Sequence, residues 1–240
     1  FFSSLLSFFL SFSSSFYFFF FFSLSCHHPH LHSFPTRRSS DLRVETTSDP
    51  KIQEKNLESK ADANTVGLWH INETSGTTVT DSSGRGNNGT ATGTTVVDGK
   101  IGKARSFNGS SDKISASTST LPVGNNPRTI EVWFKANSLA HSGLVTWGSY
   151  AASQEFGLQL DGSSHLLFWG HSNDFSGSTV LSTQKWYHAA VTYDGTTVKL
   201  YVNGQLDASS PRSLSTGSSE FLIGKGSTTE GDYFNGIIDE

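Results

Sequence analysis

The sequence predicts an all-β domain over residues 64–240, a jelly-roll or sandwich of two antiparallel sheets. Three observations predict this fold class. Gly, Ser, Thr and Asn gather in clusters, and short runs of aromatic and branched residues separate those clusters. Helical periodicity is absent from the region, and roughly 175 residues is a size that one sandwich fills.

The clearest element is the stretch WYHAAVTYDGTTVKLYVNGQLDA, residues 186–208. Apolar and aromatic residues alternate with other residues on both sides of Asp194-Gly195, and a second turn pair follows at Asn203-Gly204. Such pairs supply the positive φ angles of tight hairpins. The stretch therefore predicts a three-stranded antiparallel meander, with its core face formed by Tyr187, Ala189, Val191, Tyr193, Val198, Leu200 and Val202.

Two further stretches show the same alternation. TIEVWFKA, residues 129–136, places Ile130, Val132 and Phe134 on one face of a strand. EFGLQLDGSSHLLFWG, residues 155–170, reads as two strands around an Asp161-Gly162 turn.

Several blocks of sequence, taken in order, carry a family resemblance. The chain resembles laminin G-like domains of the concanavalin A-like lectin/glucanase superfamily at residues 67–93, 99–116, 128–136, 184–205 and 232–240. The resemblance covers nearly all of residues 64–240 and implies a concanavalin A-like jelly roll with one concave sheet. It also implies that the domain is truncated, because such domains usually continue beyond the Ile-Asp-Glu block into a final strand.

The residues before the predicted domain have a different character. HSFPTRRSSDL, residues 32–42, resembles a translated sequencing adapter, and residues 1–25 contain almost only Phe, Ser and Leu. We hypothesise that residues 1–42 are translated library sequence, expected to be disordered, fused to a fragment of an environmental gene. Residues 43–63 are charged, poor in aromatics and interrupted by Pro50, which predicts a solvated linker.

Composition excludes several classes of function. The formal net charge is −4, whereas a nucleic-acid partner requires a basic face. The single cysteine, Cys26, falls within residues 1–42, so the predicted domain has no thiol for a disulfide, a zinc site or a nucleophile. Serines interrupt the N-terminal apolar run too often for a clean membrane span.

The sequence predicts no catalytic residues. The resemblance implies that an active glucanase would carry two carboxylates on one strand, both facing the cleft. Glu131 stands alone on its strand, and alternation sends Asp239 and Glu240 to opposite faces. His188 lies between strand aromatics and is expected to be a packed or hydrogen-bonded strand residue.

A calcium site is expected at the loop DSSGRGNNG, residues 81–89. Its carboxylate, amides and carbonyl groups are hard-oxygen ligands that suit calcium. The resemblance supplies a further ligand from the late Ile-Asp-Glu block, which nominates Asp81, Asn87 and Asp239, with Asn88 less secure. In the alternative interpretation the loop is only a turn, in which Asp and Asn bond to their own backbone.

Ligand binding is expected from aromatics that stand beside short polar residues. A sugar has an apolar face that stacks on an aromatic ring and hydroxyl groups that need polar partners. The segments TWGSYAAS and FWGHSNDFSG offer both, which nominates Trp147, Tyr150, Trp169, His171, Asn173 and Asp174. The alternative is that Trp147 and Trp169 fill the core.

Together these observations predict a non-catalytic extracellular or cell-surface module of a larger secreted protein, with a glycan as its partner. Two alternatives remain open. A protein-adhesion domain would bind a cell-surface or matrix protein through a flat face or a sheet edge, and a glycoside hydrolase-related domain would release reducing ends. Fold alone does not decide among them.

Overall fold

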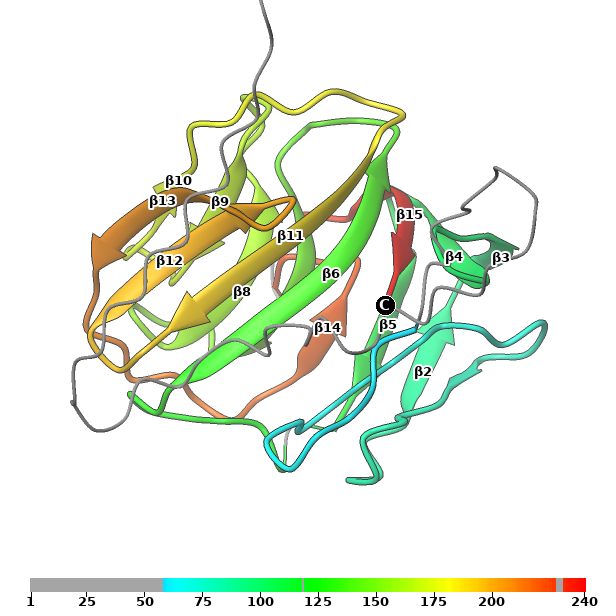
Figure 1. The fold of residues 1–240 in the computed structure, drawn as a ribbon, viewed down its shortest axis with the longest axis horizontal. Helices are drawn as coiled ribbons and strands as arrows, with labels where there is room; N and C mark the ends of the chain where they lie inside the picture. Colours follow the sequence, from blue (N-terminus) through cyan, green and yellow to red (C-terminus); the bar gives the residue numbers. More distant parts are fainter. Residues whose placement is uncertain (1–57, 118, 228–230) are drawn as a thin grey trace, which may run out of the picture. The chain divides into compact units, whose positions relative to one another are not determined.

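The computed structural model describes residues 58–117, 119–227 and 231–240. Within these ranges the chain forms two antiparallel sheets that stack face to face, so the predicted sandwich is confirmed (Figure 1). The hypothesis about residues 1–42 lies outside the described residues, as does the predicted linker up to residue 57.

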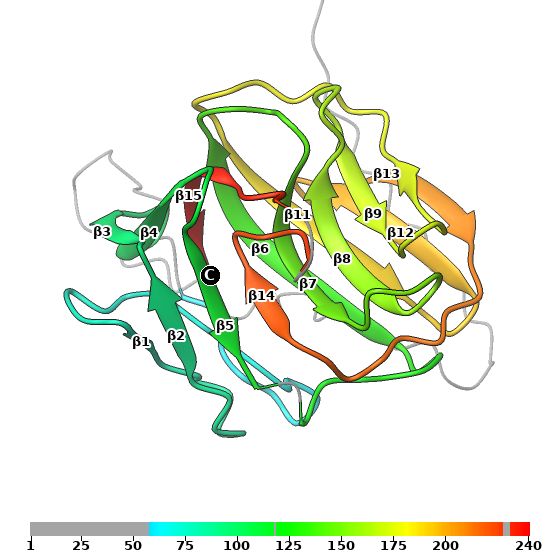
Figure 2. The same cartoon turned by 180° about the vertical axis from the view of Figure 1, so that it is seen from behind.

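The eight-stranded sheet is seen best from behind (Figure 2). Its strands, in spatial order, are β1 (Thr78–Val79), β2 (Gly89–Thr92), β5 (Lys113–Ala116), β14 (Phe221–Ile223), β7 (Ser142–Gly148), β8 (Glu155–Leu160), β9 (Leu166–Trp169) and β10 (Phe175–Ser176).

The seven-stranded sheet faces the viewer in Figure 1. Its strands, in spatial order, are β13 (Gln205–Pro211), β12 (Thr197–Val202), β11 (Trp186–Tyr193), β6 (Arg128–Ala136), β15 (Asn235–Asp239), β4 (Lys103–Asn108) and β3 (Thr95–Asp98). The last strand along the sequence, β15, therefore lies between β6 and β4.

The predicted meander is confirmed as β11, β12 and β13, each antiparallel to the next. Asn203 and Gly204 have φ angles of 49° and 78°, as the Asn-Gly pair predicts for this turn. A side chain stabilises the turn at Asp194-Gly195. Asp194 Oδ1 accepts hydrogen bonds of 2.8 Å from the backbone N–H groups of Thr196 and Thr197.

The predicted hairpin at residues 155–170 is also confirmed, with β8 antiparallel to β9. Asp161 Oδ1 accepts hydrogen bonds from the N–H groups of Ser163 and His165 in its turn. These bonds fix the register, and the register decides which side chains of β8 and β9 face the core.

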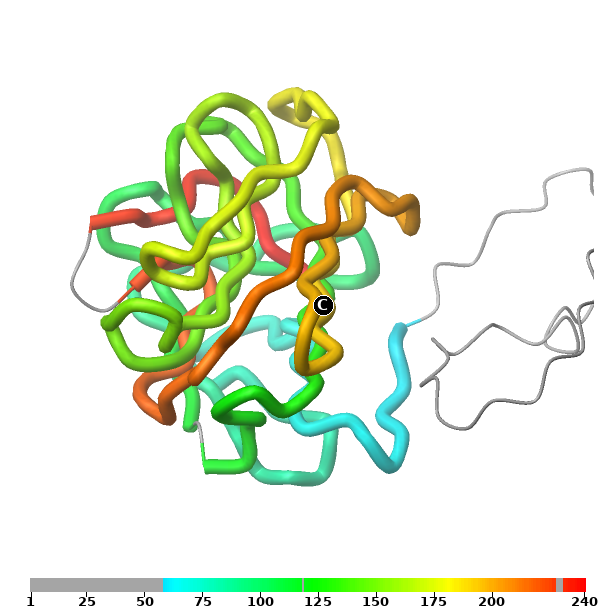
Figure 3. The backbone as a smooth tube through the Cα atoms, turned by 90° about the vertical axis from the view of Figure 1, so that its left-hand side faces the viewer, coloured from blue at the N-terminus to red at the C-terminus, as the bar shows by residue number. Residues whose placement is uncertain are grey.

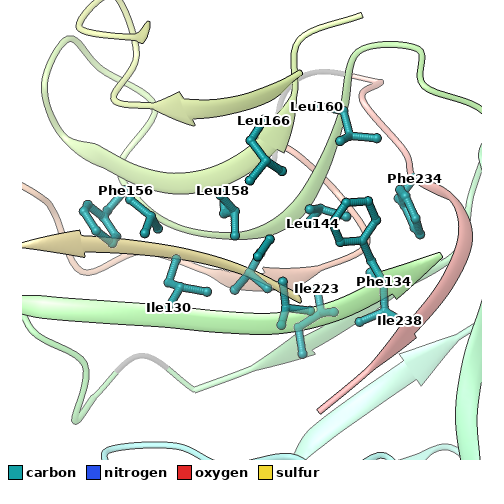
Figure 4. Close-up of a cluster of buried hydrophobic side chains, with 14 of the residues drawn as sticks. Ile130, Phe134, Leu144, Phe156, Leu158, Leu160, Leu166, Ile223, Phe234 and Ile238 are labelled. Carbon is teal, nitrogen blue, oxygen red and sulfur yellow. The ribbon is translucent and has the colours of Figure 1, made fainter. Parts of the chain in front are cut away.

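The core lies between the two sheets and is built from the alternate residues of their strands (Figure 4). Burial of each large apolar side chain contributes about 1.5–3 kcal/mol. The side chains that the close-up labels are Ile130, Phe134, Leu144, Phe156, Leu158, Leu160, Leu166, Ile223, Phe234 and Ile238.

The connection from β13 to β14 carries the chain from the seven-stranded sheet to the eight-stranded one. Figure 3 follows it as the orange segment. Its backbone is bonded to neighbouring loops, with Thr216 bridging Gly124 and Ser215 N–H donating to Ser153. Among the described residues, no helix has the length and apolar character needed to cross a membrane.

Candidate functional site

Trp169 lies on the face of the eight-stranded sheet that points away from the core. The register aligns Thr146, Gly157 and Trp169 across β7, β8 and β9. The alternate residues Leu158 and Phe168 are buried in the core, so the aligned residues occupy the opposite face. The Trp169 side chain is half-buried there, which leaves part of the ring accessible.

Trp169 belongs to a row of four rings. Its centroid lies 6.0 Å from that of His171 and 5.7 Å from that of His141. The Tyr150 ring packs edge-on against His171 at 4.2 Å and is 41% exposed. We refer to Tyr150, His171, Trp169 and His141 as the ring row. Three of the four were predicted as ligand residues, and the structure brings them together.

A buried carboxyl group, that of Glu155, holds the middle of the ring row. Glu155 Oε2 accepts a hydrogen bond of 2.7 Å from Trp169 Nε1 and lies 3.3 Å from His171 Nδ1. At the end of the row, Asp232 Oδ1 lies 3.5 Å from His141 Nδ1. Carboxyl groups therefore orient three of the four rings.

The sequence interpretation did not single out Glu155. A signal for it was present, because Glu155, Gly157 and Gln159 alternate with Phe156, Leu158 and Leu160, and the apolar set predicts that Glu155 faces outward. Its partners lie 14 and 16 residues further along the chain. A single sequence does not show that Glu155 contacts Trp169 and His171, because these contacts depend on how the strands pair.

The loop after β9 holds an unfavourable backbone conformation. His171 and Ser172 have φ angles of 53° and 62°, and Ser153, which donates its N–H to the carbonyl of His171, has a φ of 61°. Non-glycine residues lose roughly 1–2 kcal/mol each in this region. The loop is thus fixed in a strained shape that places the His171 ring between Tyr150 and Trp169.

Asn173 and Asp174, both predicted as ligand residues, support this loop. Asn173 Nδ2 donates hydrogen bonds of 3.0 Å to Ser153 Oγ and to the carbonyl of Ser213. Asp174 Oδ1 accepts one of 2.6 Å from the N–H of Gly170. These bonds show that both side chains hold the loop, and their contact with a ligand stays a prediction.

Trp147 requires a correction. It is 4% exposed, its ring packs on Phe156 and Phe221, and its Nε1 donates to the carbonyl of Pro122 at 3.1 Å. The ring lies in the core because residue 147 alternates with the outward-facing Thr146. Trp147 therefore has no face free for a sugar, and the core interpretation holds for it.

A small pocket borders the ring row. It has a volume of about 110 Å³ and is lined by Gly109, Ser138, Ala140, Ser142, Tyr233 and Asn235. Ala140 and Ser142 flank His141 in the sequence, so the pocket adjoins the end of the row that Asp232 orients.

The predicted calcium ligands fall into two separate groups. Asp81 accepts hydrogen bonds from the N–H groups of Leu68, Ser83 and Asn87, and its own N–H donates to Asn88 Oδ1. This geometry is that of the turn named as the alternative. Burial would raise the pKa of Asp81, but its hydrogen bonds outweigh that effect and keep the pKa below the ordinary value.

Asp239 has different partners. Its Oδ2 accepts from the N–H of Ile101 at 2.8 Å, and its Oδ1 is buried without a hydrogen-bond partner. Asp81 and Asp239 share no hydrogen-bonding partner, and the described ranges hold no group of three His, Cys, Asp or Glu side chains arranged for a metal ion. Calcium stays a prediction, which the metal content of the dialysed chain tests.

Known proteins resemble this chain in structure. Domain 4 of AbnA, a GH43 extracellular arabinanase from Geobacillus stearothermophilus in complex with arabinotriose, is 27% identical, with a TM-score of 0.54, over 66% of this chain and 82% of that chain. No curated protein matches.

Two other solved structures show the same fold at lower identity. Trypanosoma rangeli sialidase in complex with sialic acid is 16% identical, with a TM-score of 0.54, over 71% of this chain and 29% of that chain. The botulinum neurotoxin serotype D binding domain is 17% identical, with a TM-score of 0.52, over 72% of this chain and 46% of that chain.

A sequence model of the family Laminin_G_3 matches residues 107–240, which include most strands of both sheets and the whole ring row. The matched segment is more than half of the chain. The chain therefore belongs to the Laminin_G_3 family of the concanavalin A-like lectin/glucanases superfamily.

Proposed function

We propose that the chain is a non-catalytic carbohydrate-binding module and that the ring row is its binding surface. The observation that carries this proposal is Trp169, a half-buried outward-facing ring held by a carboxyl group and flanked by two histidines. A sugar ring stacks its apolar face on an indole, and its hydroxyl groups bond to the polar edges around it.

The arabinanase domain supports a carbohydrate as the ligand class. That domain was solved with arabinotriose, and it shares 27% of aligned residues with this chain. The arabinanase is extracellular, which supports secretion as part of a larger protein for the present chain. Arabinotriose is therefore the first ligand to test.

Two carboxyl groups lie at the ring row, and both are engaged by side chains of the row, Glu155 by Trp169 and His171 and Asp232 by His141, which favours binding over hydrolysis. Most glycosidases use two carboxyl groups that face the same bond, one of them acting as an acid. On β8 the side chain four residues after Glu155, on the same face, is the amide Gln159. Asp161 follows beyond the strand, and its carboxylate accepts bonds from its own turn and lies 3.1 Å from His165 Nδ1.

Isothermal titration of the 240-residue chain with arabinotriose, xylotriose and cellotriose tests the proposal. We expect at least one of these sugars to bind, and Trp169→Ala to abolish that binding. Trp186→Ala is the matched control, because Trp186 is half-buried on the outer face of the seven-stranded sheet, next to Lys135. Equal loss in both variants, or no binding by a folded chain, would reject the ring row as a sugar site.

The same experiment separates the other classes of function. Release of reducing ends from any of these oligosaccharides would identify a glycoside hydrolase. A folded chain that binds a cell-surface protein and no sugar would identify an adhesion domain.

A further inference from the structure

The ring row runs along the strands β7, β8 and β9, which lie side by side in Figure 2. His141 immediately precedes β7 and Tyr150 follows it by two residues, so the two end rings belong to opposite ends of one strand. A strand of seven residues is about 20 Å long. Successive centroid distances of 5.7, 6.0 and 4.2 Å connect these ends through Trp169 and His171. The row is therefore an extended track and not a compact cluster.

The accessible surface of the row is spread over its whole length. Tyr150 is 41% exposed and the His141 side chain is 35% exposed, whereas the His171 side chain between them is 20% exposed. Trp169, also between them, is half-buried. Both end rings are thus accessible to solvent, and neither end of the row is buried. A blind pocket would instead have its most buried ring at one end.

Both ends of the row are fixed in the absence of a ligand. Ser149 N–H donates a hydrogen bond of 3.0 Å to the carbonyl of Gln154, and Gln154 N–H donates one of 2.9 Å to the carbonyl of Ala151. These bonds close the short loop that carries Tyr150. At the other end, the Asp232 carboxyl group holds the ring of His141. A ligand that spans the row therefore meets rings that have little conformational freedom to lose.

We infer that the ring row binds the interior of a polysaccharide chain and contacts at least three consecutive sugar units. The inference rests on the proposed function of the ring row. Neighbouring rings are separated by about the length of one sugar unit in an extended chain. The central unit stacks on Trp169, and the units on either side of it contact Tyr150 and His141. Because both ends of the row are accessible, the chain continues past them, and binding requires no chain terminus.

Contacts with linked sugar units reinforce one another. The loss of translational and rotational freedom occurs once for the whole ligand. Each further unit is already tethered near its ring, so its contact forms at a high effective concentration. The affinity should therefore rise steeply with chain length until the row is filled, and then stay constant.

A series of oligosaccharides of increasing length tests the inference. Isothermal titration of the 240-residue chain compares one, two, three, four and six units of the sugar that binds best among the arabino-, xylo- and cello-oligosaccharides. We expect the affinity to rise at least tenfold, or ~1.4 kcal/mol, from the disaccharide to the tetrasaccharide. From four to six units it should stay within twofold. A monosaccharide that binds as tightly as the tetrasaccharide would overturn the inference and leave the proposed function standing, whereas no binding of any length would reject the proposed function.

Tyr150→Ala and His141→Ala each remove one end ring. We expect each variant to bind the tetrasaccharide about fivefold more weakly and the disaccharide nearly as well as the wild type, because the disaccharide is held at Trp169. Tyr201→Ala is the matched control, since Tyr201 alternates with the core residues of β12 and lies on the outer face of the other sheet. It should leave both affinities unchanged. Unchanged tetrasaccharide affinity in both end variants, or equal weakening of the two ligands, would overturn the inference.

A soluble linear polymer of the same sugar tests whether a chain terminus is required. We expect several copies of the protein to bind each polymer chain, as measured by analytical ultracentrifugation, and Trp169→Ala to remain unbound. At most two copies on each long chain, one for each terminus, would overturn the binding of interior segments.

Discussion

Trp169 Nε1 donates a hydrogen bond of 2.7 Å to Glu155 Oε2, and this bond joins a buried carboxyl group of β8 to the partly exposed ring that ends β9. The bond holds the indole ring of Trp169 in one orientation on the outer face of the sheet. A ring with a fixed orientation loses less conformational freedom when a ligand stacks on it.

Glu155→Ala is expected to weaken sugar binding at least fivefold and to destabilise the fold by about 1–3 kcal/mol, because the indole N–H and His171 lose their acceptor. Glu155→Gln is the control, since an amide oxygen can still accept from Trp169. We expect it to keep most of the affinity. Titration calorimetry and urea denaturation measure the two effects, and an alanine variant as tight-binding as the wild type would show that the bond does not position the ring.

The two central tryptophans are expected to respond to truncation in opposite ways. Trp147→Ala removes a ring from the core and should cost about 3–5 kcal/mol of unfolding free energy. Trp169→Ala removes a half-buried ring and should cost clearly less, yet only this change should abolish sugar binding. Urea denaturation of both variants, with binding measured under native conditions, checks the contrast. A larger loss of stability in Trp169→Ala would contradict the assignment of faces.

The sequence alone did not predict which of Trp147 and Trp169 faces the core. Each stands in a similar context, TWG and FWG, so local pattern gives both the same two alternatives. The two tryptophans face opposite sides of the sheet because Trp147 pairs with the core residue Phe156, whereas Trp169 pairs with the outward-facing Gly157. These pairings depend on the registers of β7 with β8 and of β8 with β9. The meander was predictable because its turns and alternation are local, whereas the bond between Glu155 and Trp169 depends on tertiary structure.

The calcium prediction, which stays untested, also combines local and long-range information. Asp81 and Asn87 are close in sequence and in space, as expected, but the backbone N–H groups of the loop occupy the carboxylate. The pairing with Asp239 came from the resemblance alone. The position of β15 between β6 and β4 gives Asp239 neighbours that sequence spacing does not reveal.

Arg128 anchors the loop that precedes β6. Its guanidinium donates to the carbonyl groups of Asn126, Pro122 and Gly124, and it lies over the Phe156 and Tyr193 rings. Burial lowers the pKa of Arg128 to about 10, so the group stays protonated at neutral pH.

Arg128→Met should lower the unfolding free energy by about 3 kcal/mol, because three carbonyl groups lose a charged donor. Arg128→Lys restores the charge with a single ammonium that cannot match the planar fork, and it should recover only part of the loss. Chemical denaturation measures both variants. Full recovery by lysine would show that charge, and not the geometry of the donors, holds the loop.

The raised pKa of Asp239 predicts a pH dependence of the free energy of unfolding. Burial, followed by the nearby Glu240 charge, raises its pKa from 3.8 to about 6, although the Ile101 N–H partly opposes the shift. The folded state therefore binds the Asp239 proton more tightly than the unfolded state does. Below about pH 3 the group is mostly protonated in both states, and above about pH 7 it is ionised in both.

Between those limits ionisation penalises the folded state, so the contribution of Asp239 should fall by about 3 kcal/mol as pH rises from about 3 to about 7. Asp239→Asn cannot ionise, and relative to the wild type it should gain stability as pH rises from about 3 to about 7. Thermal unfolding with a chelator present, across this range, measures the difference between the two proteins. A difference that does not change with pH would show that Asp239 keeps an ordinary pKa, and that its unpartnered oxygen is neutralised by a contact other than a proton.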